Sequence, residues 1–184
     1  MTALQTTIPA NIVPLRTNSE ALVQASPSAT TLTRLLHWSE SWRDEPGVLL
    51  PDIPAELIEA LPTALDMARH QLEPGDPGEV MAALSTLASR RGFPLPDGLA
   101  LEMDVESLAN LPRDLWRKAF RAVWEGFAYR RMPEVPDFRA HIADELAERR
   151  TRLDRLQGMQ LRLETIRLRE QWDAESRRRR RPCP

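Results

Sequence analysis

The fold follows from two adjoining stretches of sequence. They are NLPRDLWRKAFRAVWEGFAYRRMPEVPDF (residues 110–138) and HIADELAERRTRLDRLQGMQLRLETIRLREQWDAES (residues 141–176). The first begins as an amphipathic helix, because large apolar residues recur at intervals of three and four while charged residues fall opposite. Pro133 and Pro136 then predict an elbow, since the residue before a proline is pushed out of the α region. The second stretch predicts a charged helix of roughly 60 Å at 1.5 Å per residue.

The apolar face of the helix before the elbow allows two interpretations. Phe138 and Ile142 can fold back onto it, which makes it one side of a core. Basic residues interleaved with tryptophan and Tyr129 are also typical of a nucleic-acid surface. We favour the core, because the aromatic residues share the inner stripe and the basic residues occupy the outer face. The residues that would contact a nucleic acid here are Arg117, Lys118, Arg121, Arg130 and Arg131.

The long helix carries a thin apolar seam in which residues are spaced by seven, three, seven and three positions. Arg149 and Gln160 interrupt the heptad repeat, and Gly158 weakens the helix by about 1 kcal/mol relative to alanine. A second stripe of Leu161, Leu168 and Trp172 is displaced around the helix. This pattern predicts a modest coiled coil, or an arm that needs a partner. The residues expected to contact a second copy or another protein are Leu146, Leu153, Leu156, Leu163 and Ile166.

The charge of the chain is unevenly distributed, although the net charge is only -2. Residues 1–135 carry 12 basic and 18 acidic side chains, and residues 136–184 carry 13 basic and 9 acidic ones. The basic end is a run of five arginines that is expected to fray into solvent. It is either a solubilising end or a contact for phosphates or an acidic partner, with salt-dependent affinity. The run consists of Arg177, Arg178, Arg179, Arg180 and Arg181.

Upstream, the sequence predicts a small helical bundle. The first helix is expected over residues 31–43, and a second over 54–72 that Pro62 kinks or splits. Asp76 and Glu79 predict a capping box for a helix that ends at Gly92. A short helix is expected from Asp104. The predicted architecture is therefore all-α, with a flexible leader (1–29), a helical bundle (30–131), a long charged helix (134–176) and a basic tail (177–184).

The sequence contains no signature of catalysis. The motifs GxGxxG, GxSxG and the P-loop are absent, and the three histidines have no spacing typical of zinc ligands. Cys183 is the single cysteine, so no disulfide can form within the chain. No segment is apolar enough to span a membrane, and no secretory signal is recognisable. We therefore expect a cytoplasmic protein that is not an enzyme and has no cofactor, no metal site and no small-molecule substrate.

From residue 111 to about 180 the layout resembles small accessory proteins of phages and prophages from GC-rich bacteria. Some of these proteins are associated with replication, as helicase-loader-like factors, and the resemblance implies such a role here. It includes the helix start, the aromatic helix and the proline elbow. The matching residues are Leu111, Pro112, Asp114, Trp116, Trp124, Tyr129, Met132, Pro133, Pro136 and Phe138.

Three functions follow from these observations. The first is an interaction protein whose long helix self-associates or docks on a larger complex, such as a phage replication complex. The second is a nucleic-acid-binding protein that uses the arginine-rich helix faces and the tail. The third is a component of virion assembly or DNA packaging. The dependence of binding on salt distinguishes the first two functions. Phosphate contacts weaken steeply as the salt concentration rises, whereas association through an apolar seam does not.

Overall fold

A computed structural model of the 184-residue chain describes residues 27–42, 53–128 and 130–179. Within these ranges the protein is all-α, as the sequence predicts, and its one extended pairing is an isolated antiparallel bridge between Pro74 and Pro112. Most of the predicted leader lies outside the described residues. The helices are α1 (Ala29–Glu40), α2 (Ala55–Ile58), α3 (Leu61–His70), α4 (Pro77–Arg91), α5 (Leu99–Ala109), α6 (Arg113–Gly126), α7 (Val135–Ala140) and α8 (Ala143–Arg179).

Helices α4–α7 and the first turn of α8 enclose one core. Trp116 is at its centre with 1% of its surface exposed, and its ring lies 5.4 Å from that of Phe138, centroid to centroid. Phe138 and Ile142 are both buried in this core. The predicted folding of the elbow onto the aromatic helix is therefore confirmed, and the apolar stripe of α6 faces the core.

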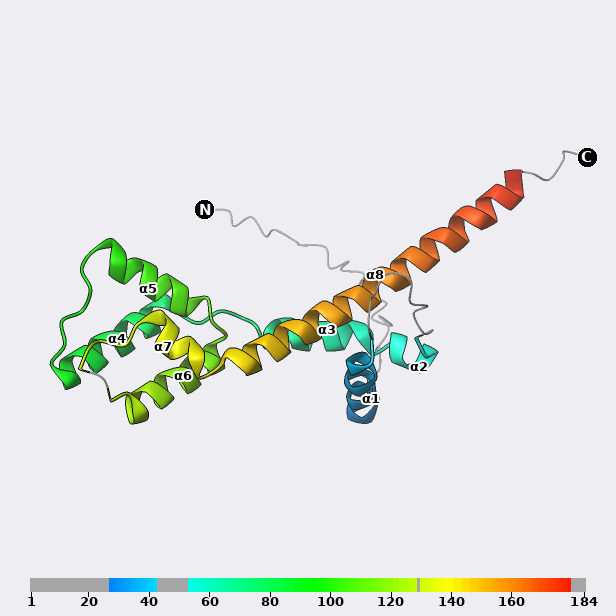
Figure 1. The fold of residues 1–184 in the computed structure, drawn as a ribbon. Helices are drawn as coiled ribbons and strands as arrows, with labels where there is room; N and C mark the ends of the chain where they lie inside the picture. The colour runs from blue at the N-terminus through cyan, green and yellow to red at the C-terminus, as the bar shows by residue number, and fades with distance from the viewer. Residues whose placement is uncertain (1–26, 43–52, 129, 180–184) are drawn as a thin grey trace, which may run out of the picture.

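A second core lies between α1–α3 and the middle of α8. Leu35 of α1 and Leu65 of α3 are buried there against Leu156 and Met159 of α8, which are both fully buried. Figure 1 shows α1–α3 beside the middle of α8, α4–α7 at one end of it, and the rest of α8 projecting beyond both. The single bundle predicted over residues 30–131 is thus two clusters, and each of them needs α8 as a wall.

The turn between α3 and α4, which connects the two clusters, is held against the turn before α6. The backbone N–H of Gly75 donates to the carbonyls of Ala109 (2.8 Å) and Leu111 (3.0 Å). The N–H of Arg113 donates to the carbonyl of Glu73 at 3.3 Å. These bonds hold the N-terminal end of α4 against the N-terminal end of α6.

Several helix boundaries differ from those predicted. The long helix was expected from residue 134, but α7 ends at Ala140 and α8 begins at Ala143. At the other end, α8 continues to Arg179, beyond the predicted end at residue 176. Arginines suit a helix C-terminus because they offset its dipole, and Arg179 donates to Glu175 one turn back at 2.6 Å. The first part of the arginine run is therefore helical.

Helix α5 begins at Leu99, about one turn before the predicted start at Asp104. Its N-terminal flanking residue is Gly98, which has a φ of 58° and no side chain to cap the helix. The usual polar capping signal is absent, so the start could not be recognised from the sequence.

We expect the substitution Gly158→Ala to stabilise the protein by up to about 1 kcal/mol, because alanine is the better helix former. A Cβ at this position would meet only Nε1 of Trp42, at 3.6 Å, which is an ordinary van der Waals distance. Gly92→Ala is the opposite case, since Gly92 ends α4 with a φ of 70°, and we expect it to destabilise by about 1 kcal/mol. Urea unfolding of both variants tests this, and a loss of stability in Gly158→Ala would contradict it.

Candidate functional site

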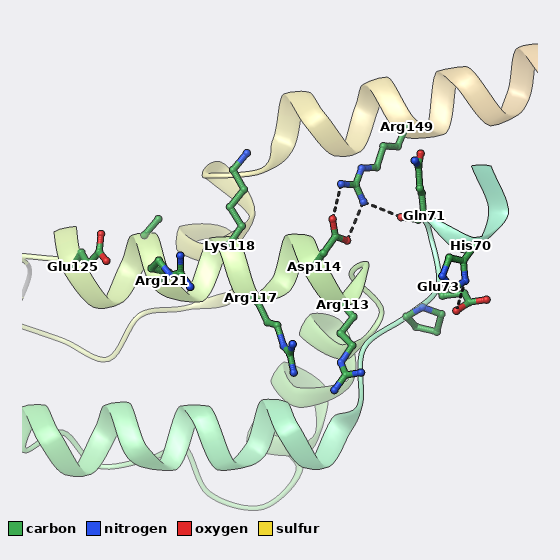
Figure 2. A pocket seen from close by; sticks show the side chains of 12 residues that line it. His70, Gln71, Glu73, Arg113, Asp114, Arg117, Lys118, Arg121, Glu125 and Arg149 are labelled. Carbon is green, nitrogen blue, oxygen red and sulfur yellow. Dashed lines mark hydrogen bonds and ion pairs between the residues drawn. The ribbon is translucent and has the colours of Figure 1, made fainter. Parts of the chain in front are cut away.

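A charged cleft of about 910 Å³ lies where the end of α3, α6 and α8 meet (Figure 2). Its cations come from α6 and α8, and its anions come from α6 and from the turn after α3. The lining side chains that carry charge or hydrogen-bonding groups are His70, Gln71, Glu73, Arg113, Asp114, Arg117, Lys118, Arg121, Glu125 and Arg149.

Arg149 is the centre of the largest hydrogen-bond network in this cleft. Its guanidinium donates to both carboxylate oxygens of Asp114 on α6, at 2.9 and 2.6 Å, and to Glu145 one turn back on α8, at 2.8 Å. It also donates to the backbone carbonyl of Gln71, at the end of α3, at 2.9 Å. Figure 2 shows the side chain reaching down from α8 to Asp114 and across to Gln71. Arg149 therefore ties α8 to one helix from each core.

Three of the other cations of the cleft are also paired with carboxylates. Glu79, at the start of α4, accepts from Arg113 (3.1 and 3.2 Å) and from Arg117 (2.5 Å). Lys118 donates to Glu145 at 2.5 Å. The hydrogen bond from Arg117, with a smaller effect of Arg113, holds the pKa of Glu79 below its usual value. These ion pairs neutralise most of the positive charge of the cleft, so little positive potential remains to attract an anionic ligand.

The predicted capping box at Asp76 forms only in part. Asp76 accepts from the backbone N–H of Glu79 at 2.9 Å, as expected. The Glu79 side chain does not return to the cap but turns to α6. A full capping box instead begins α7, where the Asp137 carboxylate accepts from the N–H of Glu134 at 2.8 Å.

The structure brings together only three of the predicted nucleic-acid contacts of the α6 region. Arg117, Lys118 and Arg121 line the cleft, whereas Arg130 and Arg131 do not. Arg117 and Lys118 are ion-paired as described, and Arg131 donates to both oxygens of Asp137, at 2.7 and 3.0 Å.

Two of these predicted contacts are left unpaired. Among the described residues, Arg121 and Arg130 have no ion pair, and both are exposed. A continuous phosphate-binding face across the five residues is therefore not present in this structure.

A shallow apolar groove of about 600 Å³ lies between α4 and α6. Phe120 and Trp124 form its floor from α6, and Ala82 and Ala83 face them from α4. Arg90 lies over the Trp124 ring, 4.7 Å from its centroid. These two aromatic rings are partly exposed. One edge of the apolar stripe of α6 is therefore buried in the core, and the other edge is open to solvent.

The predicted self-association seam of α8 is mostly occupied by the chain itself. Leu156 is fully buried in the second core, and Leu153 and Leu163 pack against that core. Leu146 is buried in the first core. Ile166 alone of the five remains exposed, at 37%. The seam therefore packs mainly within the chain, and the prediction that its residues contact a partner was wrong for those that are packed.

The second apolar stripe of α8 is the one that faces solvent. Leu161, Leu168 and Trp172 are 65%, 65% and 71% exposed. Successive residues of an α-helix are 100° apart, so Leu161 points nearly opposite to Leu163, which packs on the second core. We call residues 161–179 the arm. Leu163 near its start still packs on the second core, and beyond it α8 projects past both clusters in Figure 1. The arm is the longest exposed element of the described chain that carries large apolar side chains.

The tail residues that the structure describes lie at the tip of the arm. Arg177 and Arg178 are exposed and form no ion pair with any described residue, while Arg179 pairs with Glu175. Arg180 and Arg181 lie outside the described residues. The described tail arginines are therefore many turns along α8 from Arg149 of the cleft, and the described parts of the two predicted basic regions do not combine into one surface.

Two further properties bear on the kind of protein this is. Over the described residues, no group of three or more histidine, cysteine, aspartate or glutamate side chains is placed to hold a metal ion. None of the helices described is both long and apolar enough to cross a membrane.

Comparison with known proteins finds no match: neither a family model, nor a curated protein, nor a solved structure is significantly similar to this chain. The resemblance of residues 111–180 to phage accessory proteins stays a prediction.

Proposed function

We propose that this chain is a non-enzymatic interaction protein that self-associates through the arm. The observation that carries the proposal is the exposure of Leu161, Leu168 and Trp172, at 65–71%, on a helix whose other large apolar residues are packed apart from Ile166. Large exposed apolar side chains in one stripe are typical of a surface that contacts another protein rather than of one that stays exposed to solvent. The charged cleft, most of whose cations are paired with carboxylates, has the role of holding α8 against both cores.

The body of the protein supplies what an isolated helix lacks. A short helix in water is marginal, because nucleation costs conformational entropy before hydrogen bonds form. Here Leu156 and Met159 anchor α8 in the second core immediately before the arm begins. The arm therefore extends from a helix that is already formed, and a second copy meets an ordered apolar stripe.

The expected association is weak. Fully burying a leucine or tryptophan side chain is worth roughly 1.5–3 kcal/mol, and a pair of arms contributes three such side chains from each copy. Loss of translational and rotational freedom on association opposes this by roughly 4–15 kcal/mol. We expect a dimer with a dissociation constant in the micromolar range or above.

Light scattering over tens to hundreds of micromolar protein tests the proposal. We expect the mass of the full chain to rise from monomer to dimer, and the variant Leu168→Ser/Trp172→Ser to stay monomeric. The matched control is Leu99→Ser/Met103→Ser on α5, because these residues are also strongly exposed, at 70% and 59%. The control should dimerise like the unmodified chain. A monomeric full chain, or an arm variant that still dimerises, would overturn the proposal.

Nucleic-acid binding is the second candidate, and one observation favours it: Arg177 and Arg178 are exposed and unpaired among the described residues. Binding through the tip should weaken steeply as salt rises, since phosphate contacts release counterions. Arm pairing should change little with salt. For the interaction protein, we further propose a cytoplasmic location and a place in a phage or prophage replication complex, and both rest on the sequence alone.

A further inference from the structure

We infer that the two arms pair antiparallel, with residue 170 at the centre of the overlap. This inference rests on the proposed self-association and adds its direction and register. In this arrangement Leu168 of each copy packs against Trp172 of the second copy. Leu161 then lies opposite Arg179, so the pair spans the arm from end to end and stops where α8 meets the second core.

The stripe has the spacing of two interlocking helices. Leu161, Leu168 and Glu175 recur every seven residues, and Thr165, Trp172 and Arg179 recur every seven residues between them. These two sets are the positions that face a partner helix in a coiled coil. The direction of pairing therefore decides which of these residues meet.

A parallel pair would bring like charges into the contact. Glu175 would face Glu175 of the second copy, Arg179 would face Arg179, and the two arginine tips would lie side by side. Like charges held together in this way oppose association. The antiparallel pair avoids all three, because Glu175 lies opposite Thr165 and Arg179 lies opposite Leu161.

The flanks of the stripe offer ion pairs in either direction, because a parallel pair would bring Glu164 beside Arg169 of the second copy. Glu164 lies at one side of the stripe, and in the antiparallel register it comes beside Arg178 of the second copy. By symmetry this pair forms twice. Arg169 meets its own counterpart near the centre, which is one unfavourable contact at an exposed edge. The separation of the two arginine tips by the length of the arm outweighs it.

The body leaves room for the second helix. Upstream of the arm, Asp154 and Gln157 continue the same face of α8 as Leu161, and both are exposed. The second core covers the other side of α8, where Leu156 and Met159 are buried. A second copy can therefore lie along the arm without displacing α1 or α3.

Disulfide formation between two single-cysteine variants tests the direction. In a Cys183→Ser background, we would prepare Thr165→Cys and Glu175→Cys, give one of them a mass tag, mix them and oxidise. In the antiparallel pair these positions face each other. Position 165 would lie about 15 Å along the axis from its own counterpart, at 1.5 Å per residue, which is too far for a disulfide. Both sites are on the exposed arm, and circular dichroism checks that each variant is folded.

We expect the mixed disulfide to form several times more than either homodimer. Homodimers in both variants would show parallel pairing and overturn the inference, while the proposed self-association would stand. No disulfide in a chain whose dimerisation still requires Leu168 and Trp172 would overturn the register. A chain that stays monomeric in light scattering would overturn the proposed function itself, so the two failures are distinguishable.

Discussion

Replacing Leu156 with alanine is expected to lower the free energy of unfolding by about 2–5 kcal/mol, the usual cost of removing a large side chain from a packed interior. Leu156 is 0% exposed and lies between α8 and the helices α1–α3. The cost should appear as a lower urea midpoint, or as separate unfolding of the second core while the first core remains.

Leu161→Ala is the matched control, because it makes the same chemical change five residues later on the same helix. Leu161 is 65% exposed, so its substitution should change the stability of the monomer by no more than about 0.5 kcal/mol. It should instead weaken dimerisation. Equal losses of stability in the two variants would contradict the division of α8 into a packed face and a free stripe.

Replacing Arg149 with alanine is expected to cost about 2–3 kcal/mol, because hydrogen bonds to charged groups are the strong ones and breaking a partly buried pair leaves a carboxylate unmatched. The side chain of Arg149 is 15% exposed and binds both α6 and the end of α3. Arg152→Ala is the control: among the described residues Arg152 forms an ion pair only with Glu148 one turn back, at 2.7 Å, and such pairs contribute about 0.3–0.5 kcal/mol. Urea unfolding at neutral pH compares them.

The contribution of Arg149 should depend on pH. Its hydrogen bonds lower the pKa of Asp114 below the usual value, and the pKa of Glu145 is lowered chiefly by Lys118, with a further effect of Arg149. A carboxyl whose pKa is lower in the folded state stabilises the fold above its unfolded pKa, which is about 4. That stabilisation is lost as the pH falls through the folded pKa. The difference between the unmodified chain and Arg149→Ala should therefore be full at pH 7 and shrink below about pH 4. An unchanged difference at pH 3 would contradict this.

The sequence was sufficient to predict the elements that local patterns determine. Asp76 capped α4 as expected, and Phe138 packed on Trp116 because proline fixed the elbow and an apolar face was available. The start of α5 was missed because Gly98 provides no side-chain cap. Local signals of this kind depend on residues within a few positions of each other, and they fail only where the signal itself is missing.

The candidate site was harder to predict, because it depends on contacts between residues far apart in the chain. The period of α8 showed which leucines share a face, but not whether that face meets this chain or another. Leu146 and Leu156 were therefore assigned to a partner, although they complete the two cores. Arg149 looked like an interruption of the seam, yet it joins three helices. Only the position of α3 and α6 against α8 could show this.

The arrangement of α8 as a wall for both cores also determines when each part of the chain can fold during synthesis. The first core is made from α4–α7 and the first turn of α8, which are neighbours in sequence, so it can close as soon as that stretch leaves the ribosome. Helices α1–α3 are made before the first core but pack on Leu156 and Met159, which are made after it. Because a contact between distant residues must wait for both of them, α1–α3 remain without their core until Met159 has emerged. These three helices are thus synthesised before the first core and reach their folded position only after it can close.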